Sequence, residues 1–260
     1  MIEIHTIWDK IGFGLQNRAV YNIMLLGSEK MSGNISNVKK EVTFDDVYAN
    51  REIRSLIEAS NDVLSAMSYT EHGLRHAMNV SKTTYEILSK LEYDERTREL
   101  GRIAGYVHDI GNAVNRFNHG VTGGALLFPI LRDMGMDIVE IGKILSAVGN
   151  HEEEIGAIIS EISAALVIAD KSDAHRTRVK KGSYDKQDIH DRVNYSIKKN
   201  ILEIDPEKRL ITSKYYMDST SSVMEYLTIY RKRMTMSEHA SSYLNCRFRL
   251  MINDSYINER

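Results

Sequence analysis

The chain has almost no cysteine and almost no proline. Its single cysteine, Cys246, has no second cysteine in the chain with which to form a disulfide, and this favours a reducing compartment. Proline occurs only at Pro129 and Pro206, so long uninterrupted helices are possible over most of the 260 residues. The composition therefore argues against a disulfide-stabilised fold and favours a helical one.

The sequence also lacks long apolar runs and a surplus of positive charge. Its longest apolar stretches, such as AALVIA, are far too short to span a bilayer, and the N-terminal MIEIHTIWDK lacks the apolar stretch of a signal peptide. The formal net charge of −2 shows no basic surplus of the kind that nucleic-acid-binding proteins carry. We therefore expect a cytoplasmic protein with no membrane or nucleic-acid partner.

What is present is typical of a folded protein with a sizeable core, since 42% of the residues are hydrophobic and 27% are charged. Changes in pattern along the chain predict three parts. Residues 1–43 have no clear role, residues 44–182 form a helical domain, and residues 183–260 form a smaller α+β subdomain. The fold class predicted from the residues is mainly α.

Helical periodicity extends over nearly the whole central part. In chain order it predicts six helices. The first runs from Asp45 or Asp46 to Met67, the second begins after Thr70, the third ends near Gly111 and the fourth ends near Gly135. The fifth begins at Asp137, and the sixth runs from Ser160 to about Arg178. Past residue 195 the pattern changes. SIKKNILEID and RLITSKYYMD flank a short PEK turn and predict an antiparallel hairpin, followed by a helix from about Ser221 to Leu244 and a third strand in NCRFRLMIND.

We interpret these C-terminal elements as a ββαβ unit that covers the site, senses a ligand or mediates dimerisation. A three-stranded sheet needs its second face covered, which favours a homodimer.

Histidines cluster in the helical part, five of the nine lying between residues 72 and 151. An adjacent pair, His108 and Asp109, interrupts an apolar helix, where an imidazole and a carboxylate are costly to bury without partners. Further candidate ligands each fall on the apolar stripe of their own helix, and helical spacing directs such stripes inward. These are His76, His119, His151 and Asp170.

The chemistry of this set predicts a binuclear metal site. Four imidazoles and two carboxylates suit borderline transition ions such as Mn, Fe, Co, Ni or Zn better than calcium or magnesium. Six protein ligands are too many for one ion that keeps positions open for water and substrate, so two divalent ions bridged by Asp109 are expected. Their surplus positive charge suits a phosphate ester, which a metal-bridging hydroxide would attack.

These motifs resemble the HD-domain metal-dependent phosphohydrolase superfamily, whose signature of His, His-Asp and Asp is matched by His76, His108-Asp109 and Asp170. The segments NHGVTGGALL and GNHEEE, with His119 and His151, are similar to the binuclear branch that includes the HD-GYP phosphodiesterases. The resemblance covers about residues 44–182. It implies an HD-domain helical bundle and a phosphomonoesterase or phosphodiesterase activity on a nucleotide or related small molecule.

Further details separate this chain from named branches. HGLRHAMNV is similar to the HNxxHAxxV run of cyclic-nucleotide phosphodiesterases, which implies that His72 is a general acid and His76 a ligand. A second reading gives His72 a capping or supporting role. Asn112 stands where HD-GYP enzymes typically have lysine, and the GYP motif is missing, so the resemblance does not imply cyclic di-GMP as substrate.

Basic residues directly after Asp170 suggest a place for the substrate phosphate, and Lys171, Arg176 and Arg178 are the candidates. An exposed helix end with cations near its dipole is the alternative reading. Glu152, Glu153 and Glu154 are candidate partners of His151, or a solvated charge run. Two other functions stay open at this stage. One is an HD-fold di-iron oxygenase, and the other is a non-catalytic binding or regulatory module stabilised by its metal.

Overall fold

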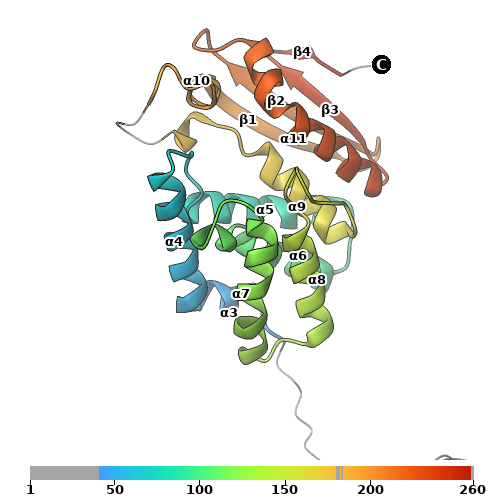
Figure 1. The fold of residues 1–260 in the computed structure, drawn as a ribbon. Helices are drawn as coiled ribbons and strands as arrows, with labels where there is room; N and C mark the ends of the chain where they lie inside the picture. Colours follow the sequence, from blue (N-terminus) through green and yellow to red (C-terminus); the bar gives the residue numbers. More distant parts are fainter. Residues whose placement is uncertain (1–40, 180–181, 183, 259–260) are drawn as a thin grey trace, which may run out of the picture. The chain divides into compact units, whose positions relative to one another are not determined.

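The computed structural model describes residues 41–179, 182 and 184–258. Residues Glu41–Arg260 form one compact unit, which contains both the predicted helical domain and the predicted α+β subdomain. Of the predicted N-terminal segment 1–43, all but the last three residues lie outside the described residues. The described part is mainly helical and carries a small C-terminal sheet, as the residue pattern predicted (Figure 1).

The first predicted helix is two helices. Thr43 caps α3 (Phe44–Ala49) with a reciprocal capping box to Asp46, and α4 (Arg51–Ala66) follows after one residue. At the junction, Asn50 has an extended backbone, and its side chain accepts a hydrogen bond from the backbone N–H of Ile53 at 3.1 Å. A single helix to Met67 was therefore wrong at this position, because an asparagine that serves as N-cap interrupts the helical ladder.

The next two helices carry the first ligands. They are α5 (Leu74–Lys90) and α6 (Glu95–Val107), followed by the short 3-10 helix η2 (Ile110–Ala113). The predicted end near Gly111 falls within η2 rather than α6. Gly111 has no room for a side chain, since a Cβ there would lie 1.9 Å from the carbonyl oxygen of His119. This close approach brings the chain after His108 against the start of the following helix.

Three further helices complete this part: α7 (His119–Asp133), α8 (Ile138–Gly149) and α9 (Glu161–Ser172), with the 3-10 helix η3 (Arg176–Arg178) after them. The predicted starts at Asp137 and Ser160 are confirmed, since each of these residues is the N-cap and accepts a backbone hydrogen bond in the first turn. The predicted end of α9 near Arg178 was wrong. The helix stops at Ser172, and the Arg178 guanidinium donates back to the carbonyl oxygen of Asp173 at 2.7 Å.

The C-terminal residues form α10 (Ile189–Ser196), β1 (Ile197–Asp205), β2 (Leu210–Met217), α11 (Val223–Tyr243), β3 (Arg247–Ile252) and β4 (Ser255–Tyr256). The predicted hairpin is confirmed as the antiparallel pair β1–β2, in which Asp205 is opposite Leu210. After α11 the chain forms β3, which pairs with β2 in parallel. The fourth strand, β4, pairs with β3 in antiparallel orientation. A two-residue strand is too short to show any alternation in sequence.

Helix α11 is anchored at its start. Ser222 and Glu225 form a capping box, and Glu225 also accepts hydrogen bonds from the Ser221 hydroxyl at 2.7 Å and from Arg192 of α10 at 2.6 Å. The hydrogen bond from Ser221, followed by the one from Arg192, lowers the pKa of Glu225 to about 2. These contacts join α10 to α11.

Helix α9 is the centre of the core. Every residue from Ile162 to Lys171 is buried, which is the pattern of a helix that is surrounded on all sides. It packs against α5, α6 and α8 and also against α11, so it lies between the other helices and the sheet (Figure 1). Because α11 packs on β3 within the same chain, the sheet has a covering helix of its own. The predicted homodimer stays a prediction.

In the part of the chain that the structure describes, no helix is long and apolar enough to cross a membrane.

Candidate metal centre

The six predicted ligands come together from five separate stretches of the chain. His76 lies in α5, His108 and Asp109 follow α6, His119 is the first residue of α7, His151 follows α8, and Asp170 lies near the end of α9. All six side chains are buried. Buried polar groups at such density need partners, and here they are one another's neighbours.

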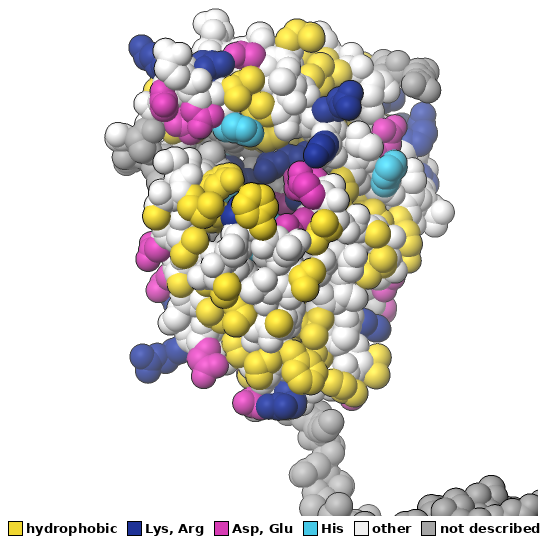
Figure 2. Space-filling model, viewed as in Figure 1, with side chains coloured by type: hydrophobic (Ala, Val, Ile, Leu, Met, Phe, Trp, Pro, Cys, Tyr) yellow, Lys and Arg dark blue, Asp and Glu magenta, His cyan; other side chains and the backbone are white. Residues whose placement is uncertain are grey.

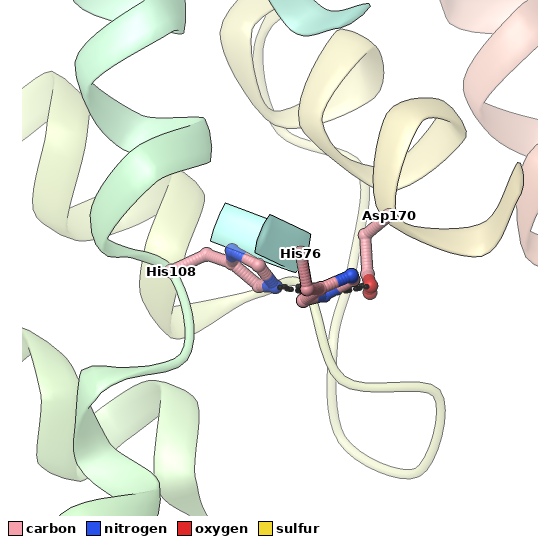
Figure 3. A group of neighbouring side chains, drawn as sticks. All are labelled: His76, His108 and Asp170. Atoms are coloured by element: carbon pink, nitrogen blue, oxygen red, sulfur yellow. Dashed lines mark hydrogen bonds and ion pairs between the residues drawn. The ribbon is translucent and has the colours of Figure 1, made fainter. Parts of the chain in front are cut away.

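One set of ligand atoms surrounds the Nε2 atom of His76 (Figure 3). This atom lies 3.3 Å from His108 Nε2 and 3.3 Å from Asp170 Oδ1, and His108 Nε2 lies 3.7 Å from the same oxygen. Asp109 Oδ2 completes the set, at 3.6 Å from His76 Nε2 and 3.3 Å from His108 Nε2. Two imidazoles and two carboxylates thus face one point.

The other oxygen of Asp109 faces a second set. Asp109 Oδ1 lies 3.1 Å from His119 Nε2 and 3.7 Å from His151 Nε2, and these two nitrogens are 3.0 Å apart. His108, Asp109 and His151 also offer ligand atoms within 4.8 Å of one another, so the two sets adjoin. One carboxylate therefore connects two clusters of imidazole nitrogens.

The tautomers of the four imidazoles follow from their other nitrogens. The Nδ1 atoms of His108 and His151 lie 3.0 Å from Gly105 O and 2.6 Å from Val148 O. Since a carbonyl oxygen only accepts, each Nδ1 carries the proton. The other two imidazoles also carry the proton on Nδ1, since His119 Nδ1 faces Arg116 O at 3.0 Å and His76 Nδ1 faces Asp173 Oδ2 at 2.6 Å.

With the proton on Nδ1, a neutral imidazole presents an Nε2 lone pair, and here these lone pairs point at one another. Nitrogens at 3.0 and 3.3 Å cannot hydrogen-bond when both are acceptors, so the arrangement requires a proton or a cation between them. For bonds of about 2.1 Å, two ligands of one ion in tetrahedral or octahedral geometry lie roughly 3.0–3.4 Å apart. The spacings of 3.0 to 3.3 Å lie in this range and those of 3.6 and 3.7 Å are slightly longer, so the buried groups could hold a metal ion.

The Asp109 carboxylate, like the imidazoles, is placed where a positive charge would stabilise it. Asp109 Oδ2 is buried and accepts no hydrogen bond among the described residues. Burial alone would lower the pKa of His108, but the neighbouring Asp109 carboxylate outweighs it and raises this pKa to about 10. Burial would raise the pKa of Asp109, yet the facing imidazoles, His108 foremost, hold it well below its usual range. Both shifts show that the cluster stabilises positive charge, whether this is a proton or a bound cation.

Asp173 is a residue of the buried cluster that the sequence analysis missed. Its carboxylate is buried and accepts the Nδ1 proton of His76 at 2.6 Å, as supporting carboxylates do beside metal-ligating histidines. It is held in place by Asn79 at 3.0 Å and Arg75 at 3.3 Å. Its only sequence signal is its place in IADKSDA, three residues after Asp170.

Of the glutamates after His151, Glu152 and Glu153 have partners other than His151, whereas Glu154 is exposed, as the reading of a solvated charge run expected. Glu152 Oε2 lies 3.1 Å from His119 Nδ1, and its Oε1 accepts from the backbone N–H of Gly120 at 2.7 Å. It therefore supports His119 and the start of α7, rather than His151. Glu154 is an exposed partner of Lys232 at 3.4 Å.

Lys171 lies beside the first ligand set. Its buried Nζ is 2.7 Å from Asp170 Oδ2 and 3.0 Å from Glu153 Oε1, and Arg233 of α11 reaches the same glutamate oxygen at 3.1 Å. Burial would raise the pKa of Glu153, but Lys171 and then Arg233 lower it to about 2. Figure 2 shows Lys, Arg, Asp and Glu side chains gathered in a hollow between α9 and α11.

The other predicted phosphate-binding arginines point elsewhere. Arg176 pairs with Asp218 at 3.0 Å and donates to the carbonyl oxygen of Tyr195 at 2.8 Å. Arg178 is buried against Asp173. Arg116, which the sequence analysis did not consider, has its Nη1 3.4 Å from His119 Nε2 and so reaches the edge of the second ligand set. Nothing in sequence periodicity marks it, because it lies between η2 and α7.

His72 lies next to the ligands, its ring centroid 5.3 Å from that of His76. Its Nδ1 donates to Thr70 O at 2.7 Å, and its backbone N–H donates to Asn61. Burial, reinforced by the charge of Arg178, holds the pKa of His72 well below its usual value. With Nδ1 protonated, Nε2 of the neutral His72 ring is an acceptor. The general-acid role stays a prediction, and it requires His72 to gain a proton during the reaction.

Comparison with known proteins adds little to this geometry. No family model matches the chain. The chain is similar to the uncharacterized protein MJ1020 of Methanocaldococcus jannaschii, with 23% identity over 161 residues, an alignment that covers 53% of this chain and 61% of that protein. The chain thus matches about three fifths of its relative's length. The buried His and Asp cluster is compatible with an HD-like metal site.

Proposed function

We propose that this protein is a metal-dependent phosphohydrolase of the HD-domain type that hydrolyses a small, nucleotide-like phosphate ester. The observation that carries the proposal is the placement of Asp109, whose two oxygens face two separate sets of imidazole nitrogens. A shared carboxylate between two such sets is what a binuclear centre requires. Two bound divalent ions would polarise a phosphoryl oxygen and lower the pKa of water to about 7, so that hydroxide is available at neutral pH.

The charge of the centre favours an anionic substrate. Two divalent ions bring four positive charges, and Asp109 and Asp170 supply two negative ones. The charge of Lys171 is largely compensated by Glu153 at 3.0 Å. A net positive centre in a buried setting attracts a phosphate group and stabilises the charge that develops on it.

Residues of the chain would position the substrate around this centre. Arg116 is half-buried at the edge of the second set, and a guanidinium there can hold a phosphate oxygen in a charge-assisted hydrogen bond. His72 lies beside His76 of the first set, and its Nε2, the nitrogen not bonded to Thr70, is the candidate proton carrier for the leaving oxygen. Asp173 and Glu152 hold His76 and His119 in orientation through their Nδ1 protons.

The test combines metal analysis with an activity screen. The purified full chain is stripped with a chelator, reloaded separately with Mn, Co, Ni, Fe or Zn, and measured for ions bound per chain. Each form is then assayed with phosphomonoesters, phosphodiesters and nucleotides. We expect two ions per chain and hydrolysis with at least one metal.

Two other results would replace this function. Oxygen consumption coupled to turnover of the iron form would indicate a di-iron oxygenase. Two bound ions without hydrolysis of any member of the panel would favour a binding or regulatory module.

A further inference from the structure

A cavity of about 450 Å³ lies on the opposite side of the His76 ring from the ligand cluster. His76 Nε2 faces the ligands, whereas its Nδ1 faces Asp173, which lines this cavity. The volume is in the range of small-molecule sites. We define the residues that line it as the α5 pocket: Arg75, Met78, Asn79, Ser81, Lys82, Arg102, Asp173, His175, Thr177 and Asn200.

The α5 pocket is built on one face of a helix. Arg75, Met78, Asn79 and Lys82 are spaced i, i+3, i+4 and i+7, so they form one stripe along α5. The stripe that faces the core is a different one, with His76 and Val80 on it. The remaining walls come from α6, from the chain after α9 and from β1, so this polar stripe forms the floor of a cavity.

The charges of the pocket favour an anion. Arg75, Lys82 and Arg102 bring three positive charges, and two carboxylates lie beside Arg75. Asp173 lines the pocket and accepts hydrogen bonds from His76, Asn79 and Arg75, and Glu71, outside the lining, pairs with Arg75 at 2.6 Å. The positive charge that these carboxylates do not neutralise therefore lies on Lys82 and Arg102.

Two of these cations have no acidic partner within the described residues. Lys82 is exposed and forms no ion pair there. Glu86 lies one turn further on, but it pairs with Lys90 at 3.2 Å. The Arg102 guanidinium lies 3.8 Å from the ring centroid of Phe44, and such a cation–π contact leaves the edge of a guanidinium available for hydrogen bonds. Cations without an acidic partner in the wall of a cavity are suited to phosphate recognition.

We propose that the α5 pocket is an effector site for a small molecule with at least two phosphate charges, such as a pyrophosphate or a nucleoside polyphosphate. Arg75, Lys82 and Arg102 bind the phosphates. A phosphate that engages Arg75 competes with Asp173 for the same guanidinium, and Asp173 in turn orients His76. Occupation of the pocket thereby changes the affinity of the metal centre. The effector role rests on the proposed function, whereas the binding site does not.

Binding is tested on metal-free full chain by isothermal titration with pyrophosphate. The variants are Lys82→Glu and, as a matched control, Lys143→Glu, which changes an exposed lysine of α8 outside the pocket. We expect one pyrophosphate per chain and an affinity at least about tenfold weaker in Lys82→Glu, since hydrogen bonds to charged groups contribute this much. Lys143→Glu should bind as the unmodified chain does. No binding, or equal losses in both variants, would overturn the site.

The effector role is tested by metal loading at identical metal and pyrophosphate concentrations in the unmodified chain and Lys82→Glu. Chelation in solution is then the same for both proteins, and a chromophoric chelator reports the competition for metal. We expect equal loading without pyrophosphate and different loading with it. Equal loading in both conditions would overturn the effector role. Because binding is measured without metal or turnover, its failure is distinguishable from the absence of hydrolase activity.

Discussion

Replacement of Asp109 by asparagine tests the binuclear centre most directly. The side chain keeps its size but loses its charge and one of its two ligand oxygens. In the structure Oδ2 faces His76 and His108 at 3.6 and 3.3 Å, and Oδ1 faces His119 at 3.1 Å. Whichever way the amide turns, one set loses its bridging oxygen and gains an NH₂ group that donates to imidazole lone pairs. The variant therefore opposes metal binding at one of the two sets.

The magnitude follows from the number of ligands. The first set falls from four protein ligands to three, or the second from three to two, depending on the orientation of the amide. Loss of a supporting outer partner of a metal ligand already costs 10–100-fold in affinity or activity, so loss of a shared ligand should cost at least about 100-fold. This corresponds to about 2.8 kcal/mol in binding free energy.

The assay is elemental analysis after dialysis against a buffered metal solution, with turnover measured on the same samples. We expect the unmodified chain to hold two ions and Asp109→Asn to hold one or none, with activity lost in parallel. Asp133→Asn is the control, since Asp133 is an exposed carboxylate at the end of α7 that contacts only Arg132 among the described residues. Thermal unfolding checks that both variants are folded. If Asp109→Asn kept two ions and full turnover, the bridging role would be refuted.

Four further outcomes are expected. His72→Ala should keep its metal content and slow the hydrolysis of esters with poor leaving groups more than that of p-nitrophenyl esters; equal losses would count against a proton-carrying role. Asp173→Ala should weaken metal binding about 10–100-fold in chelator competition, and unchanged affinity would show that the carboxylate does not support its histidine. Arg116→Gln should raise KM more than it lowers kcat, whereas unaltered kinetics would place the substrate elsewhere. Glu225 has a folded-state pKa of about 2 against an ordinary 4.5, so its stabilising effect is present above pH 4.5 and is lost as the pH falls towards 2. The unfolding temperature of Glu225→Gln should therefore lie below that of the unmodified chain at pH 7 and approach it in acid, while Glu238→Gln, at an exposed position of the same helix, should match the unmodified chain throughout.

The sequence by itself determined which residues could meet. Helical periodicity places His76, His119 and Asp170 on the buried sides of their helices, and a buried imidazole or carboxylate must find a partner. The same periodicity predicted most helices, and the turn after Asp205 predicted the hairpin. These inferences succeed because they depend on contacts within one helix or between neighbouring strands.

Only the tertiary structure decided how the ligands divide into two sets and what supports them. The rotation of the Asp109 carboxylate, the contact of Asp173 with His76 and the reach of Arg116 depend on segments up to 97 residues apart in sequence. The parallel pairing of β3 with β2 is also non-local, because α11 separates the two strands in sequence. Periodicity tells which side of an element is buried, but not which residue of another element lies opposite, because that depends on how whole helices pack.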